Sequence, residues 1–239
     1  SVQLPPDFNP VVKDNGVRGD TTVEKISKLK PAFDKYVGTI TAANASFLTD
    51  GATAVLLTSE DKAKELGLTP KAELVDYAFT GGDLYEELLL GPAYSIAEVL
   101  TKNNLTIDDI DVFEIHEAFA GQVLANLNAL ASAEWCKKQL GLDKPIGRIP
   151  MNKLNQWGGS LSIGHPFGAT GGRLLTMAAN RLQHGGGKYA ILAACAAGAH
   201  GHAMLIKRYE TTEQKVKSAA KNVIEKAEGK LEDLKEKIK

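Results

Sequence analysis

Three short segments of the 239-residue chain carry side chains that could do proton-transfer chemistry. His116 ends an apolar run of strand length, and His165 lies in the glycine-rich stretch 155–171 ahead of a helical pattern. The third segment, 194–201, is a loop of small residues that presents Cys195 and bare backbone amides directly after another apolar run. A histidine at such a helix start can be held neutral as a general base. These residue types therefore favour acid/base chemistry beside a closely approached ligand.

Each segment also has an ordinary structural explanation. Cys195 alone could be an inert buried thiol, and His116 alone could be a hydrogen-bonded structural histidine. The glycines match neither a Walker loop nor the G-x-G-x-x-G pattern after a strand. Cys195, His200 and His202 could be imagined as zinc ligands, but the spacing identifies no fourth ligand, so we expect no metal. Because all three segments follow expected strands of an α/β chain, we expect one composite site.

The elements that must position these segments alternate between strand-like and helix-like patterns. Ser59 is expected to cap a helix that Gly67 ends. The apolar periodicity predicts strands over 51–58, 71–79, 111–115, 188–195 and 202–207, and further helices over 94–102, 117–131 and 173–184. Such alternation is typical of a mostly parallel sheet covered by helices.

Composition and charge exclude several classes of function. The chain holds 28 Lys and Arg against 29 Asp and Glu, and its net charge of -1 gives no field that would gather nucleic acid. No apolar run is long enough to span a bilayer. Two cysteines form no disulfide framework and indicate a reducing compartment. The segment 211–239 is patterned as a Lys-rich amphipathic helix, either with a solvated outer face or docked on a partner protein or anionic membrane surface.

The three motifs together closely resemble the carboxyl-terminal half of thiolases. His rather than Asn at position 116, and Cys-Ala-Ala-Gly rather than Cys-x-Gly-Gly from position 195, look most like the branch formed by β subunits of the mitochondrial trifunctional protein. The resemblance covers about 16–209. It rests on HEAFA at 116–120, GHPFGATG at 164–171, CAAGAHG at 195–201, and GTITAANASFLTDGA at 38–52, which looks like the stretch that helps hold coenzyme A.

This resemblance implies a layered α/β/α thiolase fold with a mostly parallel mixed sheet, and thiolytic cleavage of a 3-ketoacyl-CoA to acetyl-CoA and a shortened acyl-CoA, or the reverse condensation. The reaction needs a thiolate nucleophile, a base, a second acid/base and two oxyanion sites. By resemblance, His165 is the base for the nucleophile and faces one thioester oxygen. Cys195 is the second acid/base, with a pKa that the site can lower towards neutral. His116 positions a water in the first oxyanion site.

Other residues are implied to support the oxyanion sites or to bind coenzyme A. Ala197 stands where many thiolases have a glycine whose backbone N–H serves the second oxyanion site, and Gly198 follows it. Asn155 is implied to support the water and the catalytic histidine. No permanently bound cofactor is implied, because coenzyme A and acyl-CoA enter as substrates. The residues implied to contact coenzyme A are Ser46, Ala42, Ala118 and Phe119.

The sequence departs from the family in one large respect, since it has no counterpart of the amino-terminal half that carries the nucleophilic cysteine. Cys136 lies in a polar helical pattern without small neighbours, and we do not assign it that role. We expect a partner chain to supply the nucleophile within a homo- or hetero-oligomer, because the strand at 51–58 would otherwise be an unpaired apolar edge. The alternative is a non-catalytic thiolase-derived structural subunit of a larger mitochondrial assembly. Intact His116, His165 and Cys195 favour the enzyme.

The sequence is expected to divide into four parts. Residues 1–37 form an extended arm with one short helix, a remnant of the thiolase loop domain, and 38–67 form the last strand and helix of the amino-terminal thiolase domain. Residues 68–209 form the carboxyl-terminal thiolase domain, and 210–239 form the amphipathic tail. The chain begins at Ser1 without a signal pattern, which suggests a processed chain or a piece of a longer one. The resemblance implies a mitochondrial location, with peroxisomal or cytoplasmic as alternatives.

Overall fold

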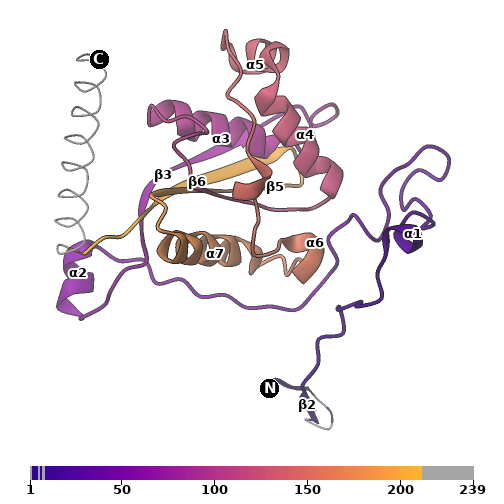
Figure 1. Cartoon of the computed structure of the whole chain (residues 1–239), viewed down its shortest axis with the longest axis horizontal. Helices are drawn as coiled ribbons and strands as arrows, with labels where there is room; N and C mark the ends of the chain where they lie inside the picture. The colour runs from indigo at the N-terminus through magenta and orange to yellow at the C-terminus, as the bar shows by residue number, and fades with distance from the viewer. Residues whose placement is uncertain (1, 5, 7–8, 212–239) are drawn as a thin grey trace, which may run out of the picture.

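A four-stranded sheet forms the centre of the computed structural model, which describes residues 2–4, 6 and 9–211 (Figure 1). Its strand order is β3-β6-β5-β4. Helices α3 and α4 lie over one face and α7 over the other, so the molecule is a layered α/β/α structure (Figure 1). The strands are β3 (Ala72–Gly81), β4 (Val112–Ile115), β5 (Tyr189–Ala196) and β6 (His200–Arg208), and the helices around them are α3 (Gly91–Lys102), α4 (Ala120–Ala131), α5 (Ala133–Leu140), α6 (Ser160–Ile163) and α7 (Thr170–Gly185).

The sheet is mixed, and the prediction of a mostly parallel sheet was wrong. Only β4 and β5 pair in parallel, whereas β6 runs antiparallel to both β5 and β3. Parallel neighbours need a crossover of about a dozen residues or more. The β4–β5 connection has that length and contains helices, but only 197–199 separate β5 from β6, so these two strands must turn back on each other.

The apolar run of β5 is explained by burial on both faces. Ile191 and Ala193 belong to the core beneath α3 and α4, whereas Ala190 and Leu192 belong to the core beneath α7. Because successive strand residues point to opposite faces, a strand covered on both sides reads as continuous hydrophobic sequence.

The segment 51–58 does not form the predicted strand. It runs as an extended, unpaired stretch past α7 to α2 (Glu60–Glu65) (Figure 1). Leu56 and Leu57 are each 74% exposed. A strand needs a neighbour for its backbone hydrogen bonds, and none of the described residues supplies one here. The predicted cap is confirmed, because the Ser59 side chain accepts a hydrogen bond from the N–H of Lys62 at the start of α2.

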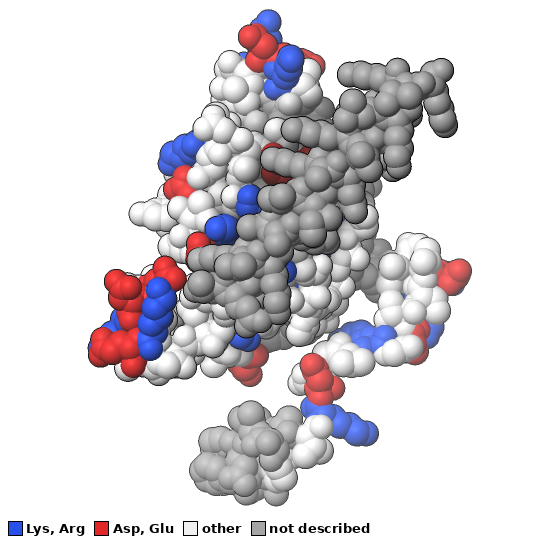
Figure 2. Space-filling view, turned by 60° about the vertical axis from the view of Figure 1, so that its left-hand side comes forward, with Lys and Arg blue, Asp and Glu red and all other residues white. Residues whose placement is uncertain are grey.

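The first part of the chain contains more local structure than predicted. Two short strands, β1 (Val2–Leu4) and β2 (Asn9–Val11), pair antiparallel, and α1 is a single turn at Val23–Ile26. Apart from Thr211, the predicted tail helix lies outside the described residues. None of the described helices is long and apolar enough to cross a membrane. Charged side chains of both signs are interspersed over the described part of the face in Figure 2.

A buried ion pair ties α7 to β4. Glu114 on β4 and Arg181 on α7 have side chains that are 0% and 8% exposed, and an Arg181 nitrogen lies 2.5 Å from a Glu114 oxygen. Arg181 also donates to the carbonyls of Phe113 at 3.1 Å and Lys153 at 2.9 Å. Burial raises the pKa of Glu114, and the hydrogen bond and charge of Arg181 oppose that rise. The Arg181 side chain thus joins α7 to β4 and to the backbone at Lys153.

Replacing Arg181 with methionine should lower the free energy of unfolding by about 3–5 kcal/mol, because it leaves the Glu114 carboxyl buried without its cation. Urea denaturation of the purified protein measures the change. The matched control is Arg148→Met at an exposed position. A loss no greater than that of the control would mean that the pair does not hold α7 to the sheet.

Candidate active site

His116 stands at the carboxyl end of β4, beside the end of β5. Its backbone N–H donates to the carbonyl of Ala193 at 2.8 Å and so extends the parallel pairing by one residue. This pairing brings His116 to the sheet edge at which β5 carries Cys195. The His116 side chain is buried, with 3% of the residue exposed.

Asn155 fixes the chain on both sides of His116. Its side-chain amide donates to the carbonyl of Ile115 at 2.9 Å and to the carboxylate of Glu117 at 2.6 Å, and its oxygen accepts from the N–H of Ile115 at 2.8 Å. Its φ of 45° is in the left-handed region, which asparagine tolerates better than most residues. Asn155 therefore braces the strand end, and it makes no hydrogen bond to either site histidine.

His165 is brought to His116 by the turn before α7. Its N–H donates to the carbonyl of Phe47 at 3.0 Å, and its ring nitrogen Nδ1 lies 2.7 Å from the hydroxyl of Thr170. The rings of His165 and His116 have centroids 4.1 Å apart and are tilted by 41°. The Phe167 ring also contacts His165, with centroids 4.6 Å apart and a tilt of 33°. Two histidines distant in sequence thus form one pair.

Both histidines are held neutral near pH 7. Burial lowers the pKa of His116 to about 4, with further lowering by His165 and by the positive charge of Arg173. Burial and Arg173 also lower the pKa of His165. A neutral imidazole has one nitrogen that can accept a proton and one that can donate, which are the two capacities that general base catalysis and oxyanion binding need.

Cys195 is half-buried at the end of β5, where it pairs across the strands with Gly201. Burial raises the pKa of its thiol and outweighs a backbone hydrogen bond that lowers it. The expectation that the site lowers this pKa towards neutral is not met by the described residues. A thiol with a raised pKa stays protonated at neutral pH and is suited to donate a proton.

The turn after Cys195 leaves two backbone donors available. Ala197 and Gly198 are exposed, and within the described part of the chain their N–H groups donate no hydrogen bond. Directly after the turn, the backbone of β6 lies very close to the start of α3. A Cβ added to Gly201 would lie only 2.2 Å from the carbonyl oxygen of Gly91. The N–H of Gly82 also donates to the carbonyl of Ala199 at 2.9 Å.

Three of the four residues expected to contact coenzyme A lie together, and the fourth lies apart from them. The N–H of Ser46 donates to the carbonyl of Ala118 at 2.9 Å, and Ala45 forms an isolated bridge with Phe119. Ser46, Ala118 and Phe119 therefore lie side by side next to His116. Ala42 is exposed and takes no part in this pairing.

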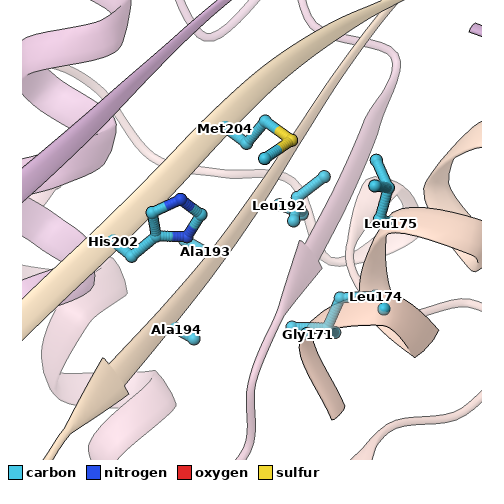
Figure 3. A pocket seen from close by; sticks show the side chains of 9 residues that line it. Gly171, Leu174, Leu175, Leu192, Ala193, Ala194, His202 and Met204 are labelled. Carbon is cyan, nitrogen blue, oxygen red and sulfur yellow. The ribbon is translucent and has the colours of Figure 1, made fainter. Parts of the chain in front are cut away.

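A cavity of about 220 Å³ lies between α7 and the strands β5 and β6. Figure 3 shows Gly171, Leu174 and Leu175 on the helix side and Ala194, His202 and Met204 on the strand side. Neither His116 nor His165 lines it. The described residues also contain no group of three or more His, Cys, Asp or Glu that could hold a metal ion.

Three residues to which the sequence motifs give no role complete the surroundings of the two histidines. The Ser160 hydroxyl lies 2.8 Å from Nδ1 of His116 and accepts from a nitrogen of Arg173 at 2.9 Å. Thr170 contacts Nδ1 of His165 as described above. Ser160 and Thr170 lie within the glycine-rich stretch, and Arg173 follows it directly. Serine, threonine and arginine are common near helix starts, so their spacing does not show that they would surround the two histidines.

Comparisons with known proteins agree with this architecture. Two family profiles match, "Thiolase, C-terminal domain" over residues 68–208 and "Thiolase, N-terminal domain" over residues 3–61. A probable 3-ketoacyl-CoA thiolase of Caenorhabditis elegans is 59% identical over 199 residues, which are 83% of this chain and 44% of that protein. The mitochondrial trifunctional enzyme subunit beta of Mus musculus is 53% identical over 204 residues, 85% of this chain and 43% of that protein.

Among solved structures, human mitochondrial 3-ketoacyl-CoA thiolase in complex with CoA superposes with a TM-score of 0.69 at 37% sequence identity. The match covers 82% of this chain and 45% of that one. The chain therefore spans about half the length of the relatives it matches. Within that span, the sequence profiles, the identities and the fold agree, and the chain belongs to the thiolase family.

Proposed function

We propose that this chain contributes the acid/base half of a thiolase site, which cleaves a 3-ketoacyl-CoA to acetyl-CoA and a shortened acyl-CoA. The observation that carries the proposal is the close pair of neutral histidines, His116 and His165, at the sheet edge that also bears Cys195. One ring of the pair is buried and the other half-buried, and placing two imidazoles there costs free energy of desolvation, which a catalytic role would explain.

In this reaction a cysteine thiolate attacks the 3-keto carbon, and His165 accepts the proton of that thiol. The bond between C2 and C3 breaks and leaves the electron pair on the acetyl-CoA carbanion, which Cys195 protonates. His116 positions a water in the first oxyanion site, and the N–H groups of Ala197 and Gly198 serve the second, so that both sites stabilise charge on the thioester oxygens. The thiol of coenzyme A then gives its proton to the Cys195 thiolate and takes the acyl group, and the released cysteine takes back the proton held by His165.

The attacking cysteine is proposed to come from a partner chain. Cys136 on α5 is fully buried, and its thiol donates to the carbonyls of Ala129 and Leu130 at 3.7 and 3.6 Å. Cys195 is better suited to proton donation, as its raised pKa keeps it protonated. No other cysteine occurs in this sequence.

The segment 51–58 is the proposed place where that partner joins. Its backbone pairs with none of the described strands, and Val55, Leu56 and Leu57 are exposed. An extended apolar segment of this length is suited to add as a strand to the edge of another sheet. The amino-terminal thiolase half would provide both the sheet and the nucleophile.

A non-catalytic structural subunit is the second candidate function. The inaccessibility of Cys136 favours it, because this chain alone cannot start the reaction. The names of the mouse relative and of the human structure both include a mitochondrial location. We propose the same location here, with coenzyme A esters as ligands, no permanently bound cofactor, and Ser46, Ala118 and Phe119 on the coenzyme side.

Native mass spectrometry of the purified protein, followed by an acetoacetyl-CoA thiolysis assay on the same sample, tests the proposal. A partner with an alkylatable cysteine, together with turnover, is the expected result. Unrelated partners and no turnover would support the structural subunit instead.

Replacing His165 with alanine should lower kcat for thiolysis by roughly 10²- to 10⁴-fold, the usual contribution of a general base. Assembly measured by native mass spectrometry should not change, because the ring is only half-buried. His184→Ala, at an exposed position near the end of α7, is the matched control. Near-normal turnover of the His165 variant would remove its catalytic role.

Replacing Cys195 with serine should also reduce thiolysis, but less completely than the loss of His165, because a hydroxyl is a poorer proton donor than a thiol. The rate of hydrogen exchange at C2 of acetyl-CoA measures this step separately from acyl transfer, and it should fall in parallel. Cys136→Ser should leave both rates unchanged. If the Cys136 variant were the inactive one, the nucleophile would lie in this chain.

A further inference from the structure

The Ser160 hydroxyl lies between a cation and a histidine ring. Ser160 is fully buried at the start of α6, and its oxygen is 2.9 Å from a nitrogen of Arg173 and 2.8 Å from Nδ1 of His116. No other side-chain hydrogen bond to this hydroxyl occurs among the described residues. Its proton and its lone pairs must therefore be shared between these two partners.

The direction of this hydrogen bond follows from the chemistry of arginine. A guanidinium only donates, so Arg173 must use a lone pair of the Ser160 oxygen. The buried hydroxyl proton then needs an acceptor, because a buried donor without a partner is destabilising. In the part of the chain that the structure describes, Nδ1 of His116 is the one acceptor bonded to this hydroxyl. His116 is neutral, so its own proton must be on Nε2.

His165 has the opposite arrangement. The Thr170 hydroxyl lies 3.1 Å from the carbonyl of Pro166 and 2.7 Å from Nδ1 of His165. The Pro166 carbonyl only accepts, here from the Thr170 hydroxyl and from the N–H groups of Ala169 and Thr170, so this contact directs the hydroxyl proton to Pro166 and leaves the hydroxyl oxygen to accept. Both contacts are satisfied together only if Nδ1 of His165 carries the ring proton. Its Nε2 then has a free lone pair.

We propose that Ser160, Arg173 and Thr170 are positioning residues that hold the two site histidines in opposite neutral tautomers. His116 then offers an N–H at Nε2, and His165 offers a lone pair at Nε2. The inference rests on the proposed function for its catalytic meaning: one ring donates towards the water of the first oxyanion site while the other accepts the thiol proton. The hydrogen-bond directions place or remove the proton at each Nδ1, and the lowered pKa of each ring keeps it neutral.

The charges around the pair are consistent with two neutral rings. Arg173 on α7 is the cation nearest to Ser160, and its charge lowers the pKa of both histidines. The carboxylates of Glu114 and Glu117 also act on Arg173, but Glu114 is paired with Arg181. Glu117 accepts from Asn155 and from the N–H of Leu161 at 3.0 Å. Neither carboxylate makes a described hydrogen bond to an imidazole.

Long-range proton–nitrogen correlation spectra of the assembled protein with ¹⁵N-labelled histidine test the tautomers directly. The chain has five histidines, so few signals need assignment, and His116→Gln and His165→Gln variants identify the two of interest. We expect a protonated Nε2 in His116 and a protonated Nδ1 in His165 at pH 7. The same tautomer in both rings would overturn the proposal.

A set of variants separates positioning from packing. Ser160→Ala should leave His116 with both tautomers populated and lower kcat by about 10- to 100-fold with little change in KM, a range taken from partners that orient metal-bound histidines. Ser160→Thr keeps the hydroxyl and should restore most of the rate. Ser162→Ala is the matched control, because that hydroxyl bonds only the backbone of Gly159. Equal loss in the alanine and threonine variants would mean that Ser160 acts through packing.

Variants at the other two positions give independent evidence. Arg173→Met removes a positive charge and should therefore raise the pKa of His116, which NMR titration measures. Thr170→Val should release the tautomer of His165 but not that of His116, whereas Thr170→Ser should preserve it.

Failure of the tautomer assignment can be distinguished from failure of the proposed thiolase activity. Opposite tautomers without turnover would retain this inference and reject the proposed thiolase activity. Turnover that depends on His165 but occurs with identical tautomers would do the reverse.

Discussion

The parallel pairing of β4 with β5 is the constraint on which the site depends. It continues one residue past β4, where the N–H of His116 bonds the carbonyl of Ala193, and so it sets His116 beside the strand end that carries Cys195. These residues are far apart in sequence because a parallel connection needs a long crossover, and the crossover itself contains Asn155 and His165. The site is thus built from the two strand ends and the connection between them.

Several close contacts keep that edge in place. Arg181 reaches from α7 to Glu114 and to two backbone carbonyls, and Asn155 spans the backbone of Ile115 and the carboxylate of Glu117. On the other side, Gly91 and Gly201 approach so closely that neither could carry a side chain. These contacts hold the groups at the site, which themselves make few hydrogen bonds to one another.

Burial favours the uncharged form of each titratable group in this site. It disfavours charge, so it lowers the pKa of His116 and His165 and raises that of Cys195. Near neutral pH the two imidazoles and the thiol are therefore all uncharged. An uncharged site can accept or donate a proton without the cost of a buried ion being present beforehand.

The sequence by itself determined the motifs, the family and most of the elements, since β-α periodicity and the local cap at Ser59 depend on neighbouring residues only. It did not determine strand direction or whether 51–58 pairs, because both depend on which backbone lies alongside. The same holds for the site. His116, His165 and Cys195 could be identified from their motifs, but the contact between the two rings, the clamp by Asn155 and the roles of Ser160, Thr170 and Arg173 could not. Burial and hydrogen-bond direction decide those features, and both are properties of the three-dimensional surroundings rather than of residue order.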